Sequence, residues 1–573
     1  MNSAAVDKGV NAAVKIDVPE SWKTLADDTK APDASLPHYI REIQIPVNKQ
    51  AGDAIPVSEF MPYADGVTPS ETSKYEKRGI AVKVPQWIPE NCIGCNKCAL
   101  VCPHAAIRPF LLNAEEEAAK PAAFVTKEAK GKGFEGLTFR MQVDPLDCQG
   151  CGACANVCPA KEKALVMELL DTQMPEQENW EHALTLSTKT NPMDKFTVRG
   201  SQFERPLYEF SGACAGCGEA PYMKLMSQLF GDRMFVTSAT GCAYVVGSST
   251  PSFPYVANEK GHGPANSNSL FEDNAEYALG MKLSIDQMRR QMAAHAEAVV
   301  ASTSDAALKS ALEAWLAEGD NGDKTRALSE AVVAALNATA ETSDDIAFLK
   351  ANKDALPKKS VWMYGGDGWA YDIGFGGVDH VLASNKDVNV FVFDTEVYSN
   401  TGGQASKASN IGQVAQFAAS GKETKKKSLA EIAMSYGYVY VAQVAMGANQ
   451  AQTLKAITEA EAYNGPSLVI GYAPCEMHSI KGGMTNCQAE MKKAVECGYW
   501  NLFRFDPSKE TGKFTLDSKA PKDGYQEFLM NEARYSRLTR EFPERAKELF
   551  PKNEAAAKER YEHLLKLVEM YKG

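Results

Sequence analysis

The stretch CIGCNKCALVCP at residues 92–103 decides the fold of the first recognisable domain, and its spacing returns in CQGCGACANVCP at residues 148–159. Each stretch reads C-x2-C-x2-C-x3-C-P, the ligand pattern for a pair of 4Fe-4S clusters. Three thiolates of one run hold one cluster, and the fourth cysteine ligates the other. The eight predicted ligands are Cys92, Cys95, Cys98, Cys102, Cys148, Cys151, Cys154 and Cys158. The sequence therefore predicts a domain that moves single electrons.

Two other interpretations of these cysteines explain the pattern less well. A zinc site uses two C-x2-C pairs or a mixture of cysteine and histidine, and it gives no reason for the third cysteine or the trailing proline. Disulfides need an oxidising compartment, whereas the opening MNSAAVDKGV lacks the basic and apolar segments of an export signal. We therefore expect iron-sulfur ligands in a reducing, cytoplasmic environment.

Composition narrows the class of protein. A chain of 573 residues is too long for one core and should divide into two to four domains. The net charge of −12, from 61 basic and 73 acidic residues, argues against a protein that binds nucleic acid by neutralising phosphates. The sequence has no continuous apolar stretch long enough for a membrane span. The acidity instead favours a protein partner that is soluble.

The sequence pattern changes several times along the chain. Residues 1–83 are rich in proline, lysine and polar breaks, and we expect a connector. Residues 84–170 form the predicted α+β two-cluster domain, which resembles bacterial ferredoxins, and residues 171–205 form a polar linker. Residues 206–573 alternate apolar strands with helical stretches, which predicts an α/β domain with a largely parallel sheet. An alanine-rich block at about 285–356 predicts a helical excursion from that sheet.

A third group of cysteines opens the α/β domain. Cys214 and Cys217 lie in GACAGCGE, and Cys242 follows in ATGC. A single C-x2-C pair can be redox-active or structural. A third cluster would need one more thiolate from a distant part of the chain, and the candidates are Cys475, Cys487 and Cys497. Spacing alone leaves that choice open, although Cys475 directly follows the strand PSLVIGYAP, at the edge where α/β sheets gather ligands.

A second motif in this domain favours a diphosphate. GGDGWAYDIG places Gly366, Asp367 and Gly368 at the end of a strand and the start of a helix, where backbone amides can approach a phosphate. Asp367 can offer its carboxylate to a magnesium ion on that diphosphate. The next strand ends at Asp394, and the loop from Thr395 can complete an oxygen coordination sphere. The pairing of these two segments is typical of thiamine-dependent enzymes.

Taken together, the two cysteine runs, GACAGCGE, ATGC, KGHGPANSNSLFEDNAE, GGDGWAYDIG and DTEVYSNTGGQ resemble the C-terminal half of pyruvate:ferredoxin (flavodoxin) oxidoreductases. The resemblance covers nearly the whole chain. It implies an enzyme that oxidises pyruvate with coenzyme A to acetyl-CoA and carbon dioxide, and that reduces two molecules of ferredoxin or flavodoxin. It also implies three cofactor types, namely three 4Fe-4S clusters, thiamine diphosphate and Mg2+.

The resemblance assigns roles residue by residue. It selects Cys475 over Cys487 and Cys497, so that Cys214, Cys217, Cys242 and Cys475 would bind the third cluster. It places magnesium on Asp367, the Thr395 side chain and the Val397 carbonyl, and it directs Asn400 toward the reacting end of the cofactor as the catalytic candidate. The residues that would line thiamine diphosphate are Glu219, Cys242, Gly366, Asp367, Gly368, Trp369, Thr395, Glu396, Val397, Tyr398, Ser399 and Asn400.

Two departures from the family bear on function. The family's substrate-binding and coenzyme A-binding parts lie in an N-terminal half, so we expect this chain to need that complement for turnover and to work in a dimeric assembly. After Cys242 the family often has small hydroxyl residues, whereas this chain has Ala243 and Tyr244. Two other functions therefore stay open: an oxidoreductase for another 2-oxoacid such as 2-oxoglutarate, and a non-catalytic electron-transfer subunit without thiamine.

Three further features have simpler interpretations. His262 and His478 could transfer protons, but we expect loop histidines that satisfy nearby carbonyl groups. Asp387 and Asn389 form a D-x-N pattern that could bind calcium, and a solvated turn is the preferred interpretation.

Overall fold

The computed structural model describes residues 2–25, 33–269 and 272–572 of the chain. The chain divides into two compact units, residues 1–67 and 68–573. In its described residues the first unit contains short helices and turns but no strand: α1 (Asn2–Asn11), α2 (Glu20–Lys23) and α3 (Ile45–Asn48). This unit ends at residue 67, whereas the predicted connector extends to residue 83.

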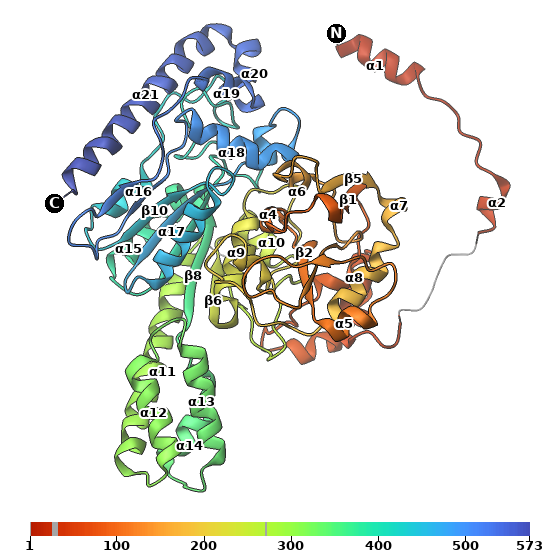
Figure 1. The fold of residues 1–573 in the computed structure, drawn as a ribbon. Coiled ribbons are helices and arrows are strands. Elements are labelled where there is room, and N and C mark those ends of the chain that lie inside the picture. The colour runs from red at the N-terminus through yellow and green to blue at the C-terminus, as the bar shows by residue number, and fades with distance from the viewer. Residues whose placement is uncertain (1, 26–32, 270–271, 573) are drawn as a thin grey trace. The chain divides into compact units, whose positions relative to one another are not determined.

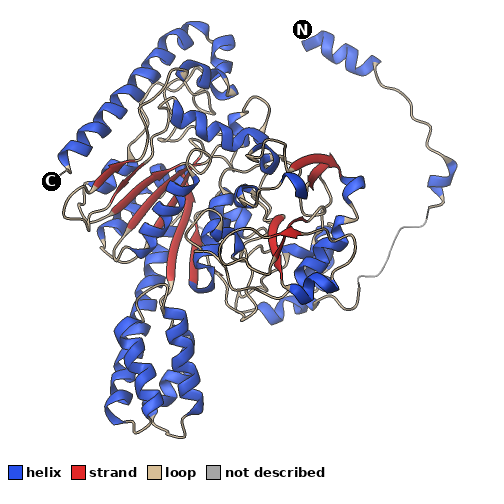
Figure 2. Cartoon of the chain, viewed as in Figure 1, coloured by secondary structure: helices blue, strands red, loops and turns tan. Residues whose placement is uncertain are grey.

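An eight-stranded sheet, among the strands drawn red in Figure 2, organises the second unit. Its strand order is β13-β12-β10-β11-β9-β8-β6-β7. The strands from β6 to β11 pair in parallel, and β12 and β13 extend one edge in antiparallel fashion. The strands are β6 (Met234–Ser238), β7 (Ala265–Asn266), β8 (Ser360–Gly366), β9 (Asn389–Asp394), β10 (Tyr440–Val444), β11 (Ser467–Tyr472), β12 (Phe503–Phe505) and β13 (Phe514–Leu516). The largely parallel α/β sheet predicted from sequence is confirmed.

Apolar runs explain why these segments form central strands. Every residue of β6, β9 and β11 is buried, which is the pattern of a parallel sheet covered by helices on both faces. The helices packed around the sheet are α9 (Ala220–Phe230), α10 (Cys242–Gly247), α15 (Phe375–Ala383), α16 (Leu429–Met434), α17 (Gln450–Ala462) and α18 (Cys487–Glu496). The carboxyl ends of β8, β9 and β11 therefore meet at one edge.

The cluster-binding region has its own small framework. Strands β1 (Lys83–Trp87) and β5 (Leu165–Leu169) pair in antiparallel fashion. The short helices α4 (Lys97–Val101) and α6 (Ala153–Asn156) lie within the two cysteine runs. The segment between the runs folds as a three-stranded sheet with one helix. Its elements are β2 (Ile107–Leu112), α5 (Ala114–Ala119), β3 (Lys127–Glu128) and β4 (Thr138–Val143). A small α+β region beside the sheet is thus confirmed.

Helices form the remaining parts of the second unit. The helical excursion lies beyond the amino ends of β6 and β8 and has a separate hydrophobic core that includes Leu308, Leu312 and Trp315 (Figure 1). It starts at Asn274, earlier than expected, because one continuous helix runs out from the sheet. Its helices are α11 (Asn274–Ser302), α12 (Ala306–Glu318), α13 (Thr325–Ala338) and α14 (Asp344–Ala351). The linker carries α7 (Leu170–Gln173) and α8 (Glu176–Thr185), and the chain finishes with α19 (Tyr525–Met530), α20 (Ala533–Glu541) and α21 (Pro543–Met570). None of the described helices is both long enough and apolar enough to cross a membrane.

Candidate functional site

The two cysteine runs fold into two thiolate groups that exchange their fourth members. Burial raises the pKa of Cys98, and the neighbouring thiolates of Cys95, Cys92 and Cys158 raise it further. Burial likewise raises the pKa of Cys154. The pKa is raised further by the neighbouring thiolates of Cys151, Cys148 and Cys102. The structure therefore brings Cys158 to the first run and Cys102 to the second, which is the exchange expected of a two-cluster fold.

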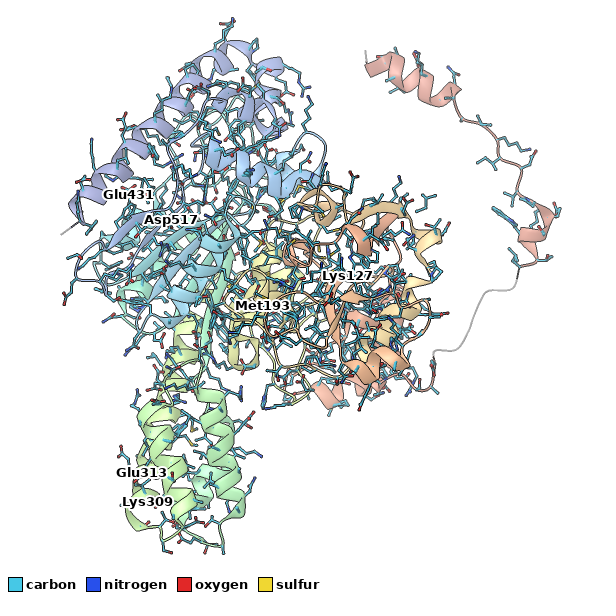
Figure 3. The ribbon with its side chains drawn as sticks, viewed as in Figure 1. Lys127, Met193, Lys309, Glu313, Glu431 and Asp517 are labelled. Atoms are coloured by element: carbon cyan, nitrogen blue, oxygen red, sulfur yellow. The ribbon has the colours of Figure 1, made fainter. Side chains whose placement is uncertain are left out.

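Backbone geometry prepares these loops for anionic sulfur ligands. The amide of Gly94 donates to Cys92 Sγ at 3.4 Å, and the amide of Gly150 donates to Cys148 Sγ at the same distance. Gly150 adopts φ +69°, and a Cβ at this position would lie 2.8 Å from the carbonyl oxygen of Lys83. Lys127, which is labelled in Figure 3, lies in β3. Its Nζ donates to the carbonyl oxygen of Cys92 at 2.7 Å and thereby ties the first loop to β3.

The third cysteine group also assembles in the structure. Cys214 and Cys217 precede α9, Cys242 opens α10, and Cys475 follows β11. Burial raises the pKa of Cys242. Nearby negative charges raise it further, and they belong to Glu219, Cys217, Cys475 and Cys214. The same i to i+2 amide contact recurs here, from Glu219 to Cys217 Sγ at 3.3 Å and from Met477 to Cys475 Sγ at 3.5 Å.

The other two candidates for the fourth thiolate are placed differently. Cys487 and Cys497 are buried, and their thiols contact the carbonyl oxygens of Pro474 and Ala494. Within the described residues, no three His, Cys, Asp or Glu side chains converge closely enough to hold a single metal ion. A 4Fe-4S cluster places each thiolate on a different iron, so its four ligands stand apart around a larger group.

Two hydrogen bonds connect the third cysteine loop to the ferredoxin-like loops. The amide of Gly216, between Cys214 and Cys217, donates to the Cys151 thiolate. His104, two residues after Cys102, places Nε2 2.9 Å from the carbonyl oxygen of Ala213, directly before Cys214. Because Cys102 joins the group of Cys148, Cys151 and Cys154, both contacts place this second thiolate group next to the third cysteine group.

Oxygen donors gather where β8 and β9 end. Thr395 Oγ1 lies 2.9 Å from Asp367 Oδ1 and 3.0 Å from the carbonyl oxygen of Val397. Both Asp367 and Thr395 are buried, and burial together with the Asp394 carboxylate raises the pKa of Asp367. A carboxylate, a hydroxyl and a carbonyl oxygen are the donors that Mg2+ prefers. The donor set predicted from sequence therefore converges in one place.

Glu219 connects the oxygen donors with the cysteine group. It is 4% exposed, and its Oε2 has no hydrogen-bond partner among the described residues. Burial, and then the Asp367 carboxylate, raises the pKa of Glu219 to about 8. A buried carboxyl oxygen without a partner needs one, and a bound cofactor would supply it. Glu219 thus fits the predicted thiamine diphosphate site.

The rest of the predicted cofactor loop is arranged around these donors. A Cβ on Gly368 would lie 2.5 Å from the Tyr398 ring, so only glycine allows the two segments to approach this closely. Ser399 Oγ lies 2.6 Å from Thr395 Oγ1 and also hydrogen-bonds to the Cys475 thiol. Trp369 is buried with its indole Nε1 unpartnered among the described residues. Asn400 is exposed.

The carboxylate of Glu396 belongs to a buried ionic network and is not one of the oxygen donors around Asp367 and Thr395. Arg534 Nη1 lies 2.7 Å from its carboxylate, and Lys426 Nζ lies 3.1 Å away. Burial opposes ionisation of Glu396, but the cations of Lys426 and Arg534 outweigh it and lower its pKa to about 2. Buried charges of this kind require paired partners, and here the pairing holds the Thr395 loop in place.

Sequence reasoning missed several residues that position the loop. Ser406 Oγ donates to Asp367 Oδ2, and Arg534 reaches Glu396 from a distant helix. These contacts span 39 and 138 residues and carry no local motif. His478, which we expected to satisfy a carbonyl group, places Nε2 2.7 Å from the carbonyl oxygen of Thr395.

The alternative calcium site at Asp387 and Asn389 is not formed. Asp387 pairs with Lys358 at 2.9 Å, while Asn389 is buried and accepts a hydrogen bond from Ser467 at 2.6 Å. The solvated turn expected there is also wrong for Asn389, because this residue starts the central strand β9.

Models of three protein families match the chain. Residues 83–161 match a 4Fe-4S dicluster domain, and residues 331–470 match the C-terminal TPP binding domain of thiamine pyrophosphate enzymes. Residues 27–81 match EKR, a domain of unknown function. The chain thus combines a two-cluster iron-sulfur domain with a thiamine diphosphate-binding domain.

The curated relatives narrow this class. The chain is 53% identical to a pyruvate-flavodoxin oxidoreductase of Enterobacter agglomerans, over 99% of this chain and 49% of the relative. It is equally identical, with the same coverage, to the pyruvate:ferredoxin oxidoreductase of Moorella thermoacetica. A mitochondrial NADP+-dependent pyruvate dehydrogenase of Euglena gracilis is 46% identical over 93% of this chain and 29% of the relative. The chain spans about half the length of the first two relatives, and its resemblance to half of such an enzyme is confirmed.

Proposed function

We propose that the chain is the cluster-bearing and thiamine diphosphate-binding half of a pyruvate:ferredoxin or flavodoxin oxidoreductase. The supporting observation is the position of Ser399, whose hydroxyl lies 2.6 Å from the predicted magnesium ligand Thr395 and hydrogen-bonds to the predicted cluster ligand Cys475. One side chain therefore joins the diphosphate site to the third cysteine group. A redox enzyme that passes electrons from thiamine to iron and sulfur needs this proximity.

Different residues of the chain would bind the different cofactors at this site. Asp367, Thr395 and the Val397 carbonyl would hold Mg2+, and backbone amides around Gly366 and Gly368 would approach the diphosphate. Cys214, Cys217, Cys242 and Cys475 would hold a third 4Fe-4S cluster. When bound, thiamine diphosphate supplies the electron sink for decarboxylation of a 2-oxoacid, and the clusters carry single electrons.

Glu219 would act between these two groups. Because its raised pKa of about 8 keeps the carboxyl protonated at neutral pH, it can donate a hydrogen bond to a cofactor without adding negative charge beside Asp367. Asn400, exposed at the end of the loop, would face the reacting end of the cofactor and remains our catalytic candidate.

The hydrogen bonds between loops suggest where electrons leave the chain. The third cysteine loop contacts the thiolate group of Cys148, Cys151, Cys154 and Cys102 through Gly216 and Cys151. That group exchanges one ligand with the group of Cys92, Cys95, Cys98 and Cys158. The group of Cys92, Cys95, Cys98 and Cys158 is therefore last in this series, and Ile93 beside Cys92 is 65% exposed. We place the docking site of ferredoxin or flavodoxin at the first run.

The partners of the proposed enzyme follow from its length and its relatives. The chain spans about half of the Enterobacter agglomerans and Moorella thermoacetica oxidoreductases, so the complement would supply the N-terminal half, with the substrate-binding and coenzyme A-binding groups. We propose that the assembly is dimeric and works in a reducing cytoplasm. Pyruvate and coenzyme A would be its substrates.

Anaerobic reconstitution of the chain tests this proposal directly. Iron and sulfide analysis should give about twelve of each per chain, as three 4Fe-4S clusters require. Calorimetry should show thiamine diphosphate binding that depends on Mg2+. About eight irons would contradict the third cluster, and a fully loaded chain without thiamine binding would favour the alternative of a pure electron-transfer subunit. The converging donors of Asp367, Thr395 and Val397 argue against that alternative.

The choice of 2-oxoacid needs the complement. With the N-terminal half present, initial rates for pyruvate and 2-oxoglutarate at matched concentrations should favour pyruvate. A preference for 2-oxoglutarate would contradict the proposed substrate while leaving the cofactor assignment intact.

A further inference from the structure

Lys224 is a fully buried cation that the functions described above do not use. It lies in α9, whose eleven residues are all buried, and its side chain is 1% exposed. Its Nζ donates to the carbonyl oxygens of Ala99 and Leu100, the latter at 3.0 Å. Ala99 and Leu100 belong to α4 and lie between Cys98 and Cys102 in the sequence. Lys224 therefore extends from the thiamine-binding domain into the turn that connects the ligands of two different clusters.

The ammonium group of Lys224 is paired with no carboxylate in the part of the chain that the structure describes. The charges acting on it are the Cys102 thiolate, the Arg108 guanidinium and the Cys98 thiolate. The charge of Arg108 is itself compensated, because Arg108 forms a buried ion pair with Glu209. Burial lowers the pKa of Lys224 to about 8, and the two thiolates act in the opposite direction. An unpaired buried ammonium is costly, so a nearby anion has to stabilise it.

The grouping of cysteines identifies that anion. Cys98 belongs to the group with Cys92 and Cys95, and Cys102 joins the group of Cys148 and Cys154. A 4Fe-4S cluster with four thiolate ligands is an anion that gains one more negative charge on reduction, and neighbouring charge sets its reduction potential. Lys224 is a cation on which a thiolate of each group acts.

We propose that Lys224 is an electrostatic positioning residue that stabilises the reduced state of both ferredoxin-type clusters. Without its charge, each of these clusters would accept an electron less readily. The effect on the third cysteine group would be smaller, because its thiolates are absent from the charges that act on Lys224. This inference rests on the proposed electron path, but it requires only the two clusters that the dicluster domain binds.

The simpler interpretation is that Lys224 merely clamps α9 to α4. Leu100 supports a packing role at this contact, since it is 2% exposed and belongs to the hydrophobic core of the sheet domain. A clamp and a counter-charge differ in one respect. A clamp needs a hydrogen-bond donor of suitable shape, whereas a counter-charge needs a positive charge.

The test is a redox titration of the full chain, reconstituted anaerobically and followed by electron paramagnetic resonance. Lys224→Gln retains a donor for the α4 carbonyls and removes the charge. At the wild-type midpoint potential, we expect the reduced-to-oxidised ratio of both ferredoxin-type clusters to fall about tenfold, which corresponds to about 59 mV for a one-electron couple. Lys224→Arg should keep wild-type potentials.

Two control variants separate charge near the clusters from general effects. Lys282→Gln removes a lysine that is 7% exposed but is paired with Asp286 at 2.6 Å, and it should leave all potentials unchanged. Arg199→Gln removes a half-buried cation that acts on Cys95, so it should produce a smaller shift confined to the cluster of the first run. Water around Arg199 screens its charge.

Three outcomes would overturn the proposal. One is an unchanged potential for both clusters in a Lys224→Gln chain that holds its full iron content. Another is an equal shift in all three clusters, which would indicate a general structural change. The last is loss of clusters in Lys224→Gln and Lys224→Arg alike, because shape rather than charge would then matter. A failure of thiamine diphosphate binding would affect none of these readouts and would count only against the proposed function.

Discussion

At the scale of a residue, the carboxylate of Asp367 holds neighbouring segments of the fold together at the proposed diphosphate site. It lies between two glycines at the end of β8, is fully buried, and contacts Thr395 and Ser406 from the neighbouring segment. Its burial near Asp394 is unfavourable unless a cation compensates the charge. The residue therefore carries a cost in stability that a bound metal ion would offset.

Replacing Asp367 with asparagine should weaken Mg2+-dependent binding of thiamine diphosphate by at least about tenfold, or about 1.4 kcal/mol. The change removes the charged ligand and keeps the volume. Calorimetric titration of the reconstituted chain at fixed Mg2+ measures the effect. Asp379→Asn makes the same chemical change in α15, where Asp379 accepts a hydrogen bond from Tyr436, and it should bind the cofactor normally. Equal affinity in the two variants would contradict the magnesium assignment.

Cys475 provides a second test at this scale. Cys475→Ser should reduce the iron content from about twelve to about eight per chain, because the third cluster loses its distant ligand. Cys487→Ser is the matched control, since Cys487 is a buried thiol twelve positions further along the chain that contacts the Pro474 carbonyl. Colorimetric iron and sulfide analysis distinguishes the two variants. A loss of four irons on replacing Cys487 instead would move the ligand assignment to that residue.

At the scale of an element, α5 depends on a single glutamate. Asn113 and Glu116 form a reciprocal capping box, and Glu116 also accepts hydrogen bonds from Ser187 and Lys189 of the linker. Burial acts against ionisation of Glu116, but the hydrogen bonds from Lys189 and the backbone outweigh it and lower its pKa to about 2. The helix thus holds the linker against the insertion between the two cysteine runs.

Glu116→Gln should destabilise α5 locally by about 1 to 3 kcal/mol at neutral pH. Because the folded pKa lies below the unfolded value, the carboxylate stabilises the helix above about pH 4.5, and this contribution is lost as pH falls toward about 2. Hydrogen exchange of the peptide covering residues 112–121 measures it, with the difference between variant and wild type shrinking at pH 3. Glu115→Gln, at an exposed position in the same turn, should exchange as the wild type does. A difference that persists unchanged at pH 3 would refute the electrostatic explanation.

At the scale of the whole molecule, activity should require a second polypeptide. The chain spans about half the length of its oxidoreductase relatives, so we expect no coenzyme A-dependent oxidation of pyruvate by this chain alone. Adding the N-terminal half of the Moorella thermoacetica relative should produce pyruvate-dependent reduction of ferredoxin or flavodoxin. Spectrophotometric assay of the acceptor detects this. As a control, the N-terminal half is mixed with an Asp367→Asn chain. Turnover by the chain without the N-terminal half would contradict the prediction.

Local sequence was sufficient to predict the two-cluster region and the central strands. The cysteine spacing in each run is short enough that one loop determines three ligands, and the apolar runs of β6, β8, β9, β10 and β11 permit burial on both faces. The glycines around Asp367 and the end of β9 at Asp394 are also local signals. Each of these signals lies within a segment of about ten residues, so the local sequence pattern is enough to identify it.

Tertiary structure decided what depends on contacts between distant residues. Cys475 lies more than two hundred positions from Cys217, and spacing could not choose it over Cys487 or Cys497 without the resemblance to a family. The placement of Glu396 on Arg534, of His478 on Thr395 and of Lys224 beside α4 likewise appeared only when the sheet and its helices were packed. The physical reason is that burial and charge compensation depend on neighbours in space, which the order of residues along the chain does not specify.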